Sequence, residues 1–271
     1  MELKDIFSRR IVLFGYGRMG GALLDGWIKS GLNLENIVVY EINPNRRLLA
    51  LEEKGIILNP KQKITADTCV FAVKPQGLED LLMNFPKNIK FSLLVSVIAG
   101  TPISKFVTKF GDKVSIVRTM PNTPSLVSAG ITAIVGQKKC TKEELAKVDL
   151  LMSAVGQTVR LKEEAEIDIV TAISGSGPAY IFLLIEAMVS TGIELGLSRE
   201  LSLKLAKQTV FGAGKLIVAS DTSPESLREN VTSPGGTTEA ALKILSENNM
   251  FKDLMKNAIK AAHNRSLELR A

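Results

Sequence analysis

The chain has 271 residues, of which 45% are hydrophobic, so it can form one large domain or two modest domains with packed cores. Its 34 Lys and Arg residues against 28 Asp and Glu residues give a formal net charge of +6. This excess is scattered rather than gathered in a basic run, and only 5% of residues are aromatic, which argues against nucleic-acid binding and favours small anionic ligands.

The cysteines and the N-terminal residues fit a cytoplasmic protein. Cys69 and Cys140 have neither a CxxC spacing nor the spacing of a zinc site, and no other cluster offers metal ligands. Residues 1–10 lack the apolar segment of a signal peptide. The closest approach to a membrane span, residues 179–197, is interrupted by two glutamates, so we expect neither a membrane span nor a metal.

A glycine-rich motif follows the first predicted strand, residues 10–14, and precedes a helical pattern. This context is typical of a dinucleotide-binding loop, although a structural glycine-rich turn is the alternative. In such a loop Gly15 permits the tight turn, Gly17 lets the backbone approach a pyrophosphate, and Gly20 lets helix and strand pack closely. The motif consists of Gly15, Tyr16, Gly17, Arg18, Met19 and Gly20.

The second predicted strand, residues 37–40, ends next to Glu41. An acid about 20 residues beyond a glycine-rich loop can bind a ribose 2′-hydroxyl, and it should repel a 2′-phosphate. Arg46 and Arg47 lie at the start of the next predicted helix, residues 44–54, and could attract that phosphate. The sequence therefore leaves both NAD and NADP open.

Strands and helices continue to alternate as far as residue 163. Further strands are predicted at residues 69–73, 93–98, 114–119, 131–135 and, at the sheet edge, 159–161, with helices at 78–83, 101–110 and 142–152. Continuous apolar strands between amphipathic helices indicate a parallel sheet covered on both faces. We therefore predict an α/β fold with a Rossmann-type dinucleotide-binding domain over residues 1–163.

Two more motifs follow predicted strands of this sheet. One is Ala72-Val73-Lys74-Pro75-Gln76, and the other is Met120-Pro121-Asn122-Thr123-Pro124. Because ligands of open α/β sheets bind beyond the carboxyl ends of the strands, we expect both motifs to line one crevice with the glycine-rich loop. The alternatives are an ordinary surface lysine at Lys74 and a simple double-proline turn.

The remaining residues, 164–271, are predicted to be all helical. Helices are expected at residues 165–173, 178–195, 198–219, 224–231, 237–248 and 251–269. The helix at 178–195 is apolar on nearly every side, so it must be buried within its domain or in a dimer. The sequence thus predicts a helical dimerisation domain, and close packing is the favoured reason for the small residues at 174–177.

A second glycine-rich loop, residues 233–238, precedes the helix that starts near residue 237. Backbone N–H groups of such a loop and the helix N-terminus can bind a small anion, although an ordinary helix cap is the alternative. The only histidine, His263, lies on a predicted helix near the C-terminus. The sequence therefore offers no obvious histidine for acid/base catalysis. Hydride transfer to a carbon that is already electrophilic, such as an iminium, fits this composition.

Five motifs resemble the pyrroline-5-carboxylate reductase family and occur in that family's order. They are GYGRMG, AVKPQ, MPNTP, SGSGPAY and LRENVTSPGGTTEAAL, and the last is the most specific. The resemblance implies reduction of 1-pyrroline-5-carboxylate to L-proline with NADPH or NADH. It also implies helical domains that interlock into dimers, often assembled into decamers.

The resemblance also implies roles for individual residues. Thr238 would bond the ring nitrogen, the loop around it would hold the substrate carboxylate, and Lys74 would lie beside the cofactor. The substrate-binding residues implied are Glu164, Ser233, Gly235, Gly236, Thr237 and Thr238. The cofactor-binding residues, from motif and resemblance together, are Gly15, Tyr16, Gly17, Arg18, Met19, Gly20, Glu41, Arg46, Asn59, Ala72, Val73, Lys74, Pro75 and Asn230.

Two other functions remain open. Dehydrogenases of the β-hydroxyacid or 6-phosphogluconate type also begin with this glycine motif, but they carry a catalytic lysine on a helix that here, at residues 178–195, has none. A dinucleotide-sensing protein that dimerises through its helices would have no reason to keep Thr238 and its loop. A turnover assay separates an enzyme from a sensor.

Overall fold

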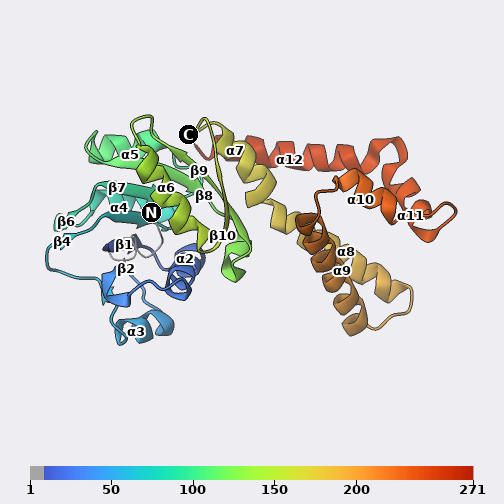
Figure 1. The fold of residues 1–271 in the computed structure, drawn as a ribbon, viewed down its shortest axis with the longest axis horizontal. Coiled ribbons are helices and arrows are strands. Elements are labelled where there is room, and N and C mark those ends of the chain that lie inside the picture. The colour runs from blue at the N-terminus through green and yellow to red at the C-terminus, as the bar shows by residue number, and fades with distance from the viewer. Residues whose placement is uncertain (1–8, 271) are drawn as a thin grey trace. The chain divides into compact units, whose positions relative to one another are not determined.

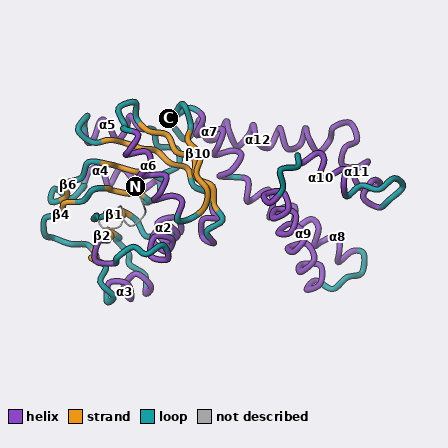
Figure 2. The backbone as a smooth tube through the Cα atoms, in the orientation of Figure 1, coloured by secondary structure: helices purple, strands orange, loops and turns teal. Residues whose placement is uncertain are grey.

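The computed structural model describes residues 9–270, which divide into two compact units (Figure 1). The first unit runs through Gly175 and also includes the C-terminal end from His263 onward, and the second unit is Ser176–Ala262. All strands of the described residues belong to the first unit (Figure 2). The domain boundary predicted between residues 163 and 164 stays a prediction.

The first unit is built on an eight-stranded sheet with the order β10-β9-β8-β7-β5-β1-β2-β3. Its strands are β1 (Ile11–Phe14), β2 (Ile37–Tyr40), β3 (Ile57–Leu58), β5 (Thr68–Phe71), β7 (Leu93–Ser96), β8 (Ser115–Met120), β9 (Gly130–Gly136) and β10 (Gly156–Arg160). A separate pair is formed by β4 (Ile64–Thr65) and β6 (Ile89–Lys90). The edge strand predicted around residue 159 is confirmed as β10.

The prediction of a wholly parallel sheet is wrong at β9, which runs antiparallel to β8. The connection between these strands is residues 121–129 and contains only the short 3₁₀ helix Thr123–Val127. A parallel crossover needs about a dozen residues or more, so this connection can only reverse the chain. The helix α6 (Lys142–Ser153) supplies such a crossover between β9 and β10, which are parallel.

Helices cover both faces of the sheet, as predicted. Residues Ile11 and Leu13 of β1 pack into one core with α2 and α6, while the alternate residues Val12 and Phe14 pack into another with α4 and α5. Burial of apolar side chains on both faces stabilises the sheet. The helices of this unit are α2 (Arg18–Lys29), α3 (Arg46–Glu52), α4 (Leu78–Met83), α5 (Ile103–Phe110), α6, and α7 (Glu166–Val170), which continues into a π-helical turn at Thr171–Gly175.

The second unit is helical, with α8 packed against α9. Its helices are α8 (Gly177–Glu194), α9 (Arg199–Ala219), α10 (Pro224–Asn230), α11 (Thr237–Ser246) and α12 (Met250–Glu268), the last of which ends in the first unit. No residue of α8 is buried within the chain, and Phe182 and Leu183 are 58% and 66% exposed. The sequence predicted that this apolar helix is buried either within its own domain or in a dimer. The first alternative is therefore wrong, and burial against a second copy of the chain stays the prediction.

A buried ion pair links α6 to the start of β5. The Lys147 ammonium donates to Asp67 at 2.7 Å, and both side chains are largely buried. Burial acts to raise the pKa of Asp67, but hydrogen bonds from Lys147, Thr68 and Arg9 together with the Lys147 charge lower it below its usual value. A carboxyl whose pKa is lowered by folding stabilises the fold above its unfolded pKa, and this stabilisation disappears as the pH falls through the folded pKa.

We expect Asp67→Asn to lower the free energy of unfolding by about 3 kcal/mol at pH 7, because it leaves a buried ammonium without its partner. The difference from the unsubstituted protein should shrink as the pH falls below about 4, the usual pKa of an unfolded aspartate, and on through the lower pKa of Asp67 in the fold. Urea unfolding followed by the fluorescence of Trp27, the single tryptophan, measures both values. An equal difference at pH 7 and pH 2 would contradict the assignment.

We also expect Phe182→Glu to weaken self-association at least tenfold in sedimentation velocity experiments, since an unpaired carboxylate in an apolar interface is costly. Met83→Glu is the matched control, because Met83 is an exposed hydrophobic residue of the first unit. Equal behaviour of the two variants would exclude α8 from the interface.

Candidate active site

A cavity of ≈ 750 Å³ lies at the carboxyl ends of β1, β2 and β5. The strand order places β1 between β2 and β5, so this is a point where the direction of chain progression across the sheet reverses. Ligands of open α/β sheets bind at such points. The predicted residues that line the cavity are Gly15, Tyr16, Gly17, Glu41, Asn59, Ala72, Val73 and Lys74.

The three glycines of the first loop have distinct structural roles. Gly15 has a φ of +93°, and a Cβ atom there would lie 2.8 Å from the Ala72 carbonyl oxygen. A Cβ at Gly20 would lie 2.1 Å from the Gly15 carbonyl oxygen, so this glycine is required for close packing. A Cβ at Gly17 would meet nothing within 4 Å, and the loop therefore leaves open space beside the start of α2.

The start of α2 can receive an anion in this space. No side chain caps the helix, and its first turn has no acidic residue. Its first N–H groups therefore need a partner, and the helix dipole favours a negative one. The residues present thus fit the pyrophosphate of a dinucleotide, held by backbone N–H groups of the loop and of α2.

Glu41 lies beside the same loop. Its carboxylate accepts a hydrogen bond from the Tyr16 backbone N–H at 2.7 Å. Burial, and then the charge of Asp25, raise the pKa of the Tyr16 hydroxyl. Lys74 is exposed at the cavity wall, while Arg47 forms an ion pair with Asp25 at 2.5 Å.

Several predicted cofactor residues do not line this cavity. Met19 packs against the core of the sheet, and Gly20 packs against Gly15. Asn230 belongs to the second unit, where it ends α10 and is exposed. Arg18, Arg46 and Pro75 are exposed residues outside the cavity lining.

The expectation that the proline-rich motif shares this crevice is not met. Residues 120–124 do not line the cavity, and Asn122 is 9% exposed. The Asn122 side chain donates to the Ser174 carbonyl oxygen at 3.1 Å and accepts from the Ile131 N–H at 2.9 Å. The motif follows β8, which is separated from β5 by β7, and its asparagine ties the β8–β9 turn to the π-helical turn.

Glu164 is held by a buried arginine that the sequence reasoning missed. One Glu164 carboxylate oxygen accepts from the Arg118 guanidinium and from the Ile103 N–H, each at 2.9 Å. Burial lowers the pKa of Arg118, whose side chain is 2% exposed, and the adjacent Glu164 carboxylate opposes this effect. The only feature of the sequence that could have indicated this contact is the presence of an arginine inside the apolar strand β8.

The second glycine-rich loop forms a tight turn at the start of α11. Gly235 has a φ of +69°, and the Gly236 N–H donates to the Ser233 carbonyl oxygen at 3.0 Å. The Gly235 N–H donates to the Glu239 carboxylate at 2.7 Å, so an acidic residue of the first turn of α11 already lies on the loop. No side chain caps α11, which begins at Thr237, and Thr238 is partly buried.

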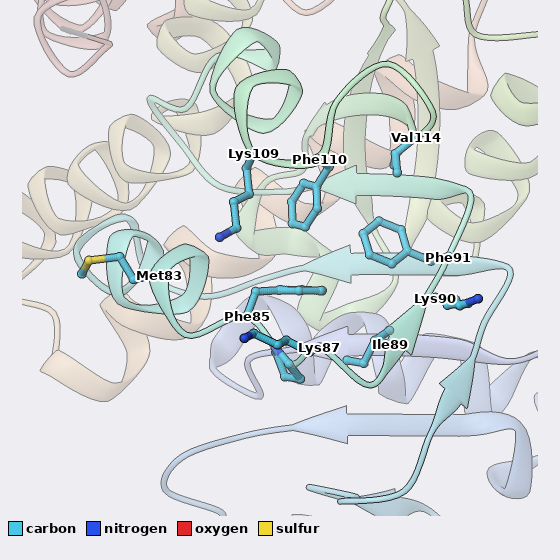
Figure 3. Close-up of a pocket in the computed structure, with 10 residues that line it drawn as sticks. Met83, Phe85, Lys87, Ile89, Lys90, Phe91, Lys109, Phe110 and Val114 are labelled. Carbon is cyan, nitrogen blue, oxygen red and sulfur yellow. The ribbon is translucent and has the colours of Figure 1, made fainter.

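Nothing among residues 9–270 forms a cluster of metal ligands. Another hollow, of ≈ 540 Å³, is lined mainly by phenylalanines and lysines and contains no predicted site residue (Figure 3). The glycine-loop cavity and the loop before α11 are therefore two separate candidate binding sites, one in each unit.

Comparison with known proteins finds relatives over almost the whole chain. Residues 164–269 match the family described as pyrroline-5-carboxylate reductase dimerisation, and residues 10–100 match NADP oxidoreductase coenzyme F420-dependent. A pyrroline-5-carboxylate reductase of Pseudomonas aeruginosa is 38% identical over 96% of both chains.

Two solved structures have the same fold over nearly their full lengths. That of a pyrroline-5-carboxylate reductase from Coxiella burnetii has a TM-score of 0.86 and 34% identity, covering 97% of this chain and 99% of that one. That of a Plasmodium falciparum pyrroline carboxylate reductase with NADP bound has a TM-score of 0.84 and 31% identity, covering 98% and 100%.

The glycines of the first loop allow a direct test of the cavity. We expect Gly17→Ala to leave the thermal unfolding temperature nearly unchanged but to weaken dinucleotide binding at least tenfold, because its methyl group occupies the open space. Gly20→Ala should instead lower the unfolding temperature, since overpacking costs about 1–3 kcal/mol. Calorimetric titration with NADH and NADPH measures binding. Unchanged binding by folded Gly17→Ala would place the pyrophosphate elsewhere.

Proposed function

Because this chain belongs to the pyrroline-5-carboxylate reductase family, we propose that it reduces the C=N bond of 1-pyrroline-5-carboxylate to give L-proline. The protein is an NAD(P)H-dependent oxidoreductase. The observation that carries the proposal is similarity over nearly the whole chain, combined with a cavity at the glycine-rich loop that fits a dinucleotide.

The proposed reaction needs a dinucleotide site and a substrate site. When bound, the dihydronicotinamide supplies a hydride to the imine carbon, and the protonated ring nitrogen becomes the secondary amine of proline. Because an iminium carbon is already electrophilic, the protein needs no strong acid or histidine. Its task is to hold the two reactants in the reactive orientation, which accounts for much of such catalysis.

The loop before α11 is the proposed substrate site. N–H groups of Thr237 and Thr238 belong to the first turn of α11 and have no partner within that helix, so they can receive the substrate carboxylate. Ser233, Gly235 and Gly236 form the turn beside them, and the Thr238 hydroxyl bonds the ring nitrogen. Glu164 remains a proposed substrate contact, with one carboxylate oxygen already accepting two hydrogen bonds.

The exposed apolar surface of the second unit serves self-association. The segment Glu166–Glu194 is long and apolar enough to cross a membrane by length and composition alone. It lies, however, inside the region that matches the dimerisation family, and we assign its apolar surface to a protein interface. We propose a cytoplasmic enzyme that binds neither membranes nor nucleic acids, present as a dimer or as a decamer built from dimers.

The reaction is tested with the purified full-length chain, 1-pyrroline-5-carboxylate, and NADH or NADPH. We expect loss of the dihydronicotinamide absorbance and formation of proline in equal amounts, with proline identified by chromatography. Cofactor binding without turnover would contradict the proposed substrate and would favour a related cyclic imine or a dinucleotide sensor.

We expect Thr238→Ala to lower kcat/KM by roughly tenfold or more, the effect of about one hydrogen bond lost in the transition state. Thr238→Ser should retain most of the activity, because it keeps the hydroxyl. Thr222→Ala, which removes an exposed hydroxyl of the same unit, is the control. Unchanged steady-state kinetics in folded Thr238→Ala would exclude the proposed role.

A further inference from the structure

The carboxylate of Glu41 has a fixed place in the wall of the glycine-loop cavity. One oxygen accepts from the Tyr16 N–H at 2.7 Å, and the other accepts from the Asn43 N–H at 3.0 Å. Both donors belong to the backbone, one in the glycine-rich loop and one just beyond β2. The negative charge is therefore held between these two segments, where the strand β2 ends.

Asn59 holds the main chain of Glu41 in this position. Its side-chain oxygen accepts from the Glu41 N–H at 3.0 Å, and its side-chain amide donates to the Glu41 carbonyl oxygen at 2.9 Å. Its own N–H donates to the Val39 carbonyl oxygen at 2.9 Å, so it extends the pairing of β3 with β2. A φ of +44° lets it do so, a conformation that asparagine adopts more readily than most residues.

The charges around the cavity oppose a phosphate beside Glu41. The charged residues of the lining are Glu41, Lys74 and Asp80, and neither Arg46 nor Arg47 is among them. The guanidinium of Arg47 is paired with Asp25. A phosphate monoester adds about −1.5 to −2 of charge, whereas a ribose hydroxyl can donate a hydrogen bond to a carboxylate.

We propose that this protein binds NADH in preference to NADPH, with Glu41 selecting the ribose 2′-hydroxyl and Asn59 acting as the positioning residue for Glu41. This deepens the proposed function and rests on it only for the use of a nicotinamide cofactor. It also changes the role implied for Asn59 by family resemblance, from a direct cofactor contact to a support of the selecting residue.

Calorimetric titration of the full-length protein with NADH and with NADPH, in the absence of any imine, tests the preference. We expect NADH to bind on the order of tenfold more tightly or better, since juxtaposed like charges are strongly unfavourable. Glu41→Gln should remove most of this ratio, chiefly by strengthening NADPH binding. Equal or tighter NADPH binding by the unsubstituted protein, or an unchanged ratio in Glu41→Gln, would overturn the proposal.

The role of Asn59 is tested by Asn59→Gly, which keeps the positive φ accessible and removes both hydrogen bonds to Glu41. We expect it to lower the NADH preference of the unsubstituted protein, and to have no further effect on the ratio in the Glu41→Gln background. Asn33→Gly is the matched control, because Asn33 is an exposed asparagine outside the cavity lining whose side chain accepts from the Glu35 N–H. Equal weakening of both cofactors would show a direct contact and overturn the positioning role.

Thermal unfolding confirms that each variant is folded, and Asn59→Ser is the second variant should Asn59→Gly fail to fold. Titration with ADP-ribose and its 2′-phosphate isolates the adenosine end, and the same preference is expected there. A protein that prefers NADH but does not turn over 1-pyrroline-5-carboxylate would support this inference while contradicting the proposed substrate.

Discussion

Two glycine-rich loops expose backbone N–H groups that neither a strand nor a helix can satisfy, and in both loops a glutamate of the same chain accepts one of them. Glu41 accepts from Tyr16, and Glu239 accepts from Gly235. Such groups need a partner when they are removed from water, and a carboxylate is a strong one. The same N–H groups that suit these carboxylates suit the anionic parts of a dinucleotide and of an amino-acid precursor.

The sheet determines where the first of these loops lies. Apolar strands covered on both faces leave only the strand ends open, and the reversal of strand order around β1 brings the ends of β2 and β5 beside the glycine-rich loop. The close approach of Gly20 to the Gly15 carbonyl oxygen then sets the start of α2 against that loop. The helical unit differs from the sheet unit, because many of its apolar residues are exposed in the single chain. Self-association through the dimerisation region buries them.

Interactions between distant residues account for what sequence reasoning missed. The asparagine of the proline-rich motif looked like a crevice residue, yet Asn122 is a structural tie between a turn and a helix 52 residues away. The buried Arg118 gave little signal, because its partner Glu164 lies 46 residues further along the chain. Asn59 was associated with the cofactor by resemblance, and only the two hydrogen bonds to the main chain of Glu41 show what its side chain does.

The sequence by itself determined the order of the longer strands and of the helices, both glycine-rich loops, the candidate Glu41, and the need to bury an apolar helix, because these depend on local periodicity and on residue types at short spacing. It did not predict the two-residue strands β3, β4 and β6, which are too short to show a periodic pattern. Only the tertiary structure decided that β9 runs antiparallel to β8, that residues 120–124 do not line the cavity, and that no residue of α8 is buried within its own chain. These features depend on which strands are neighbours and on hydrogen bonds between residues far apart in the chain, and such pairings follow from the packing of the whole chain.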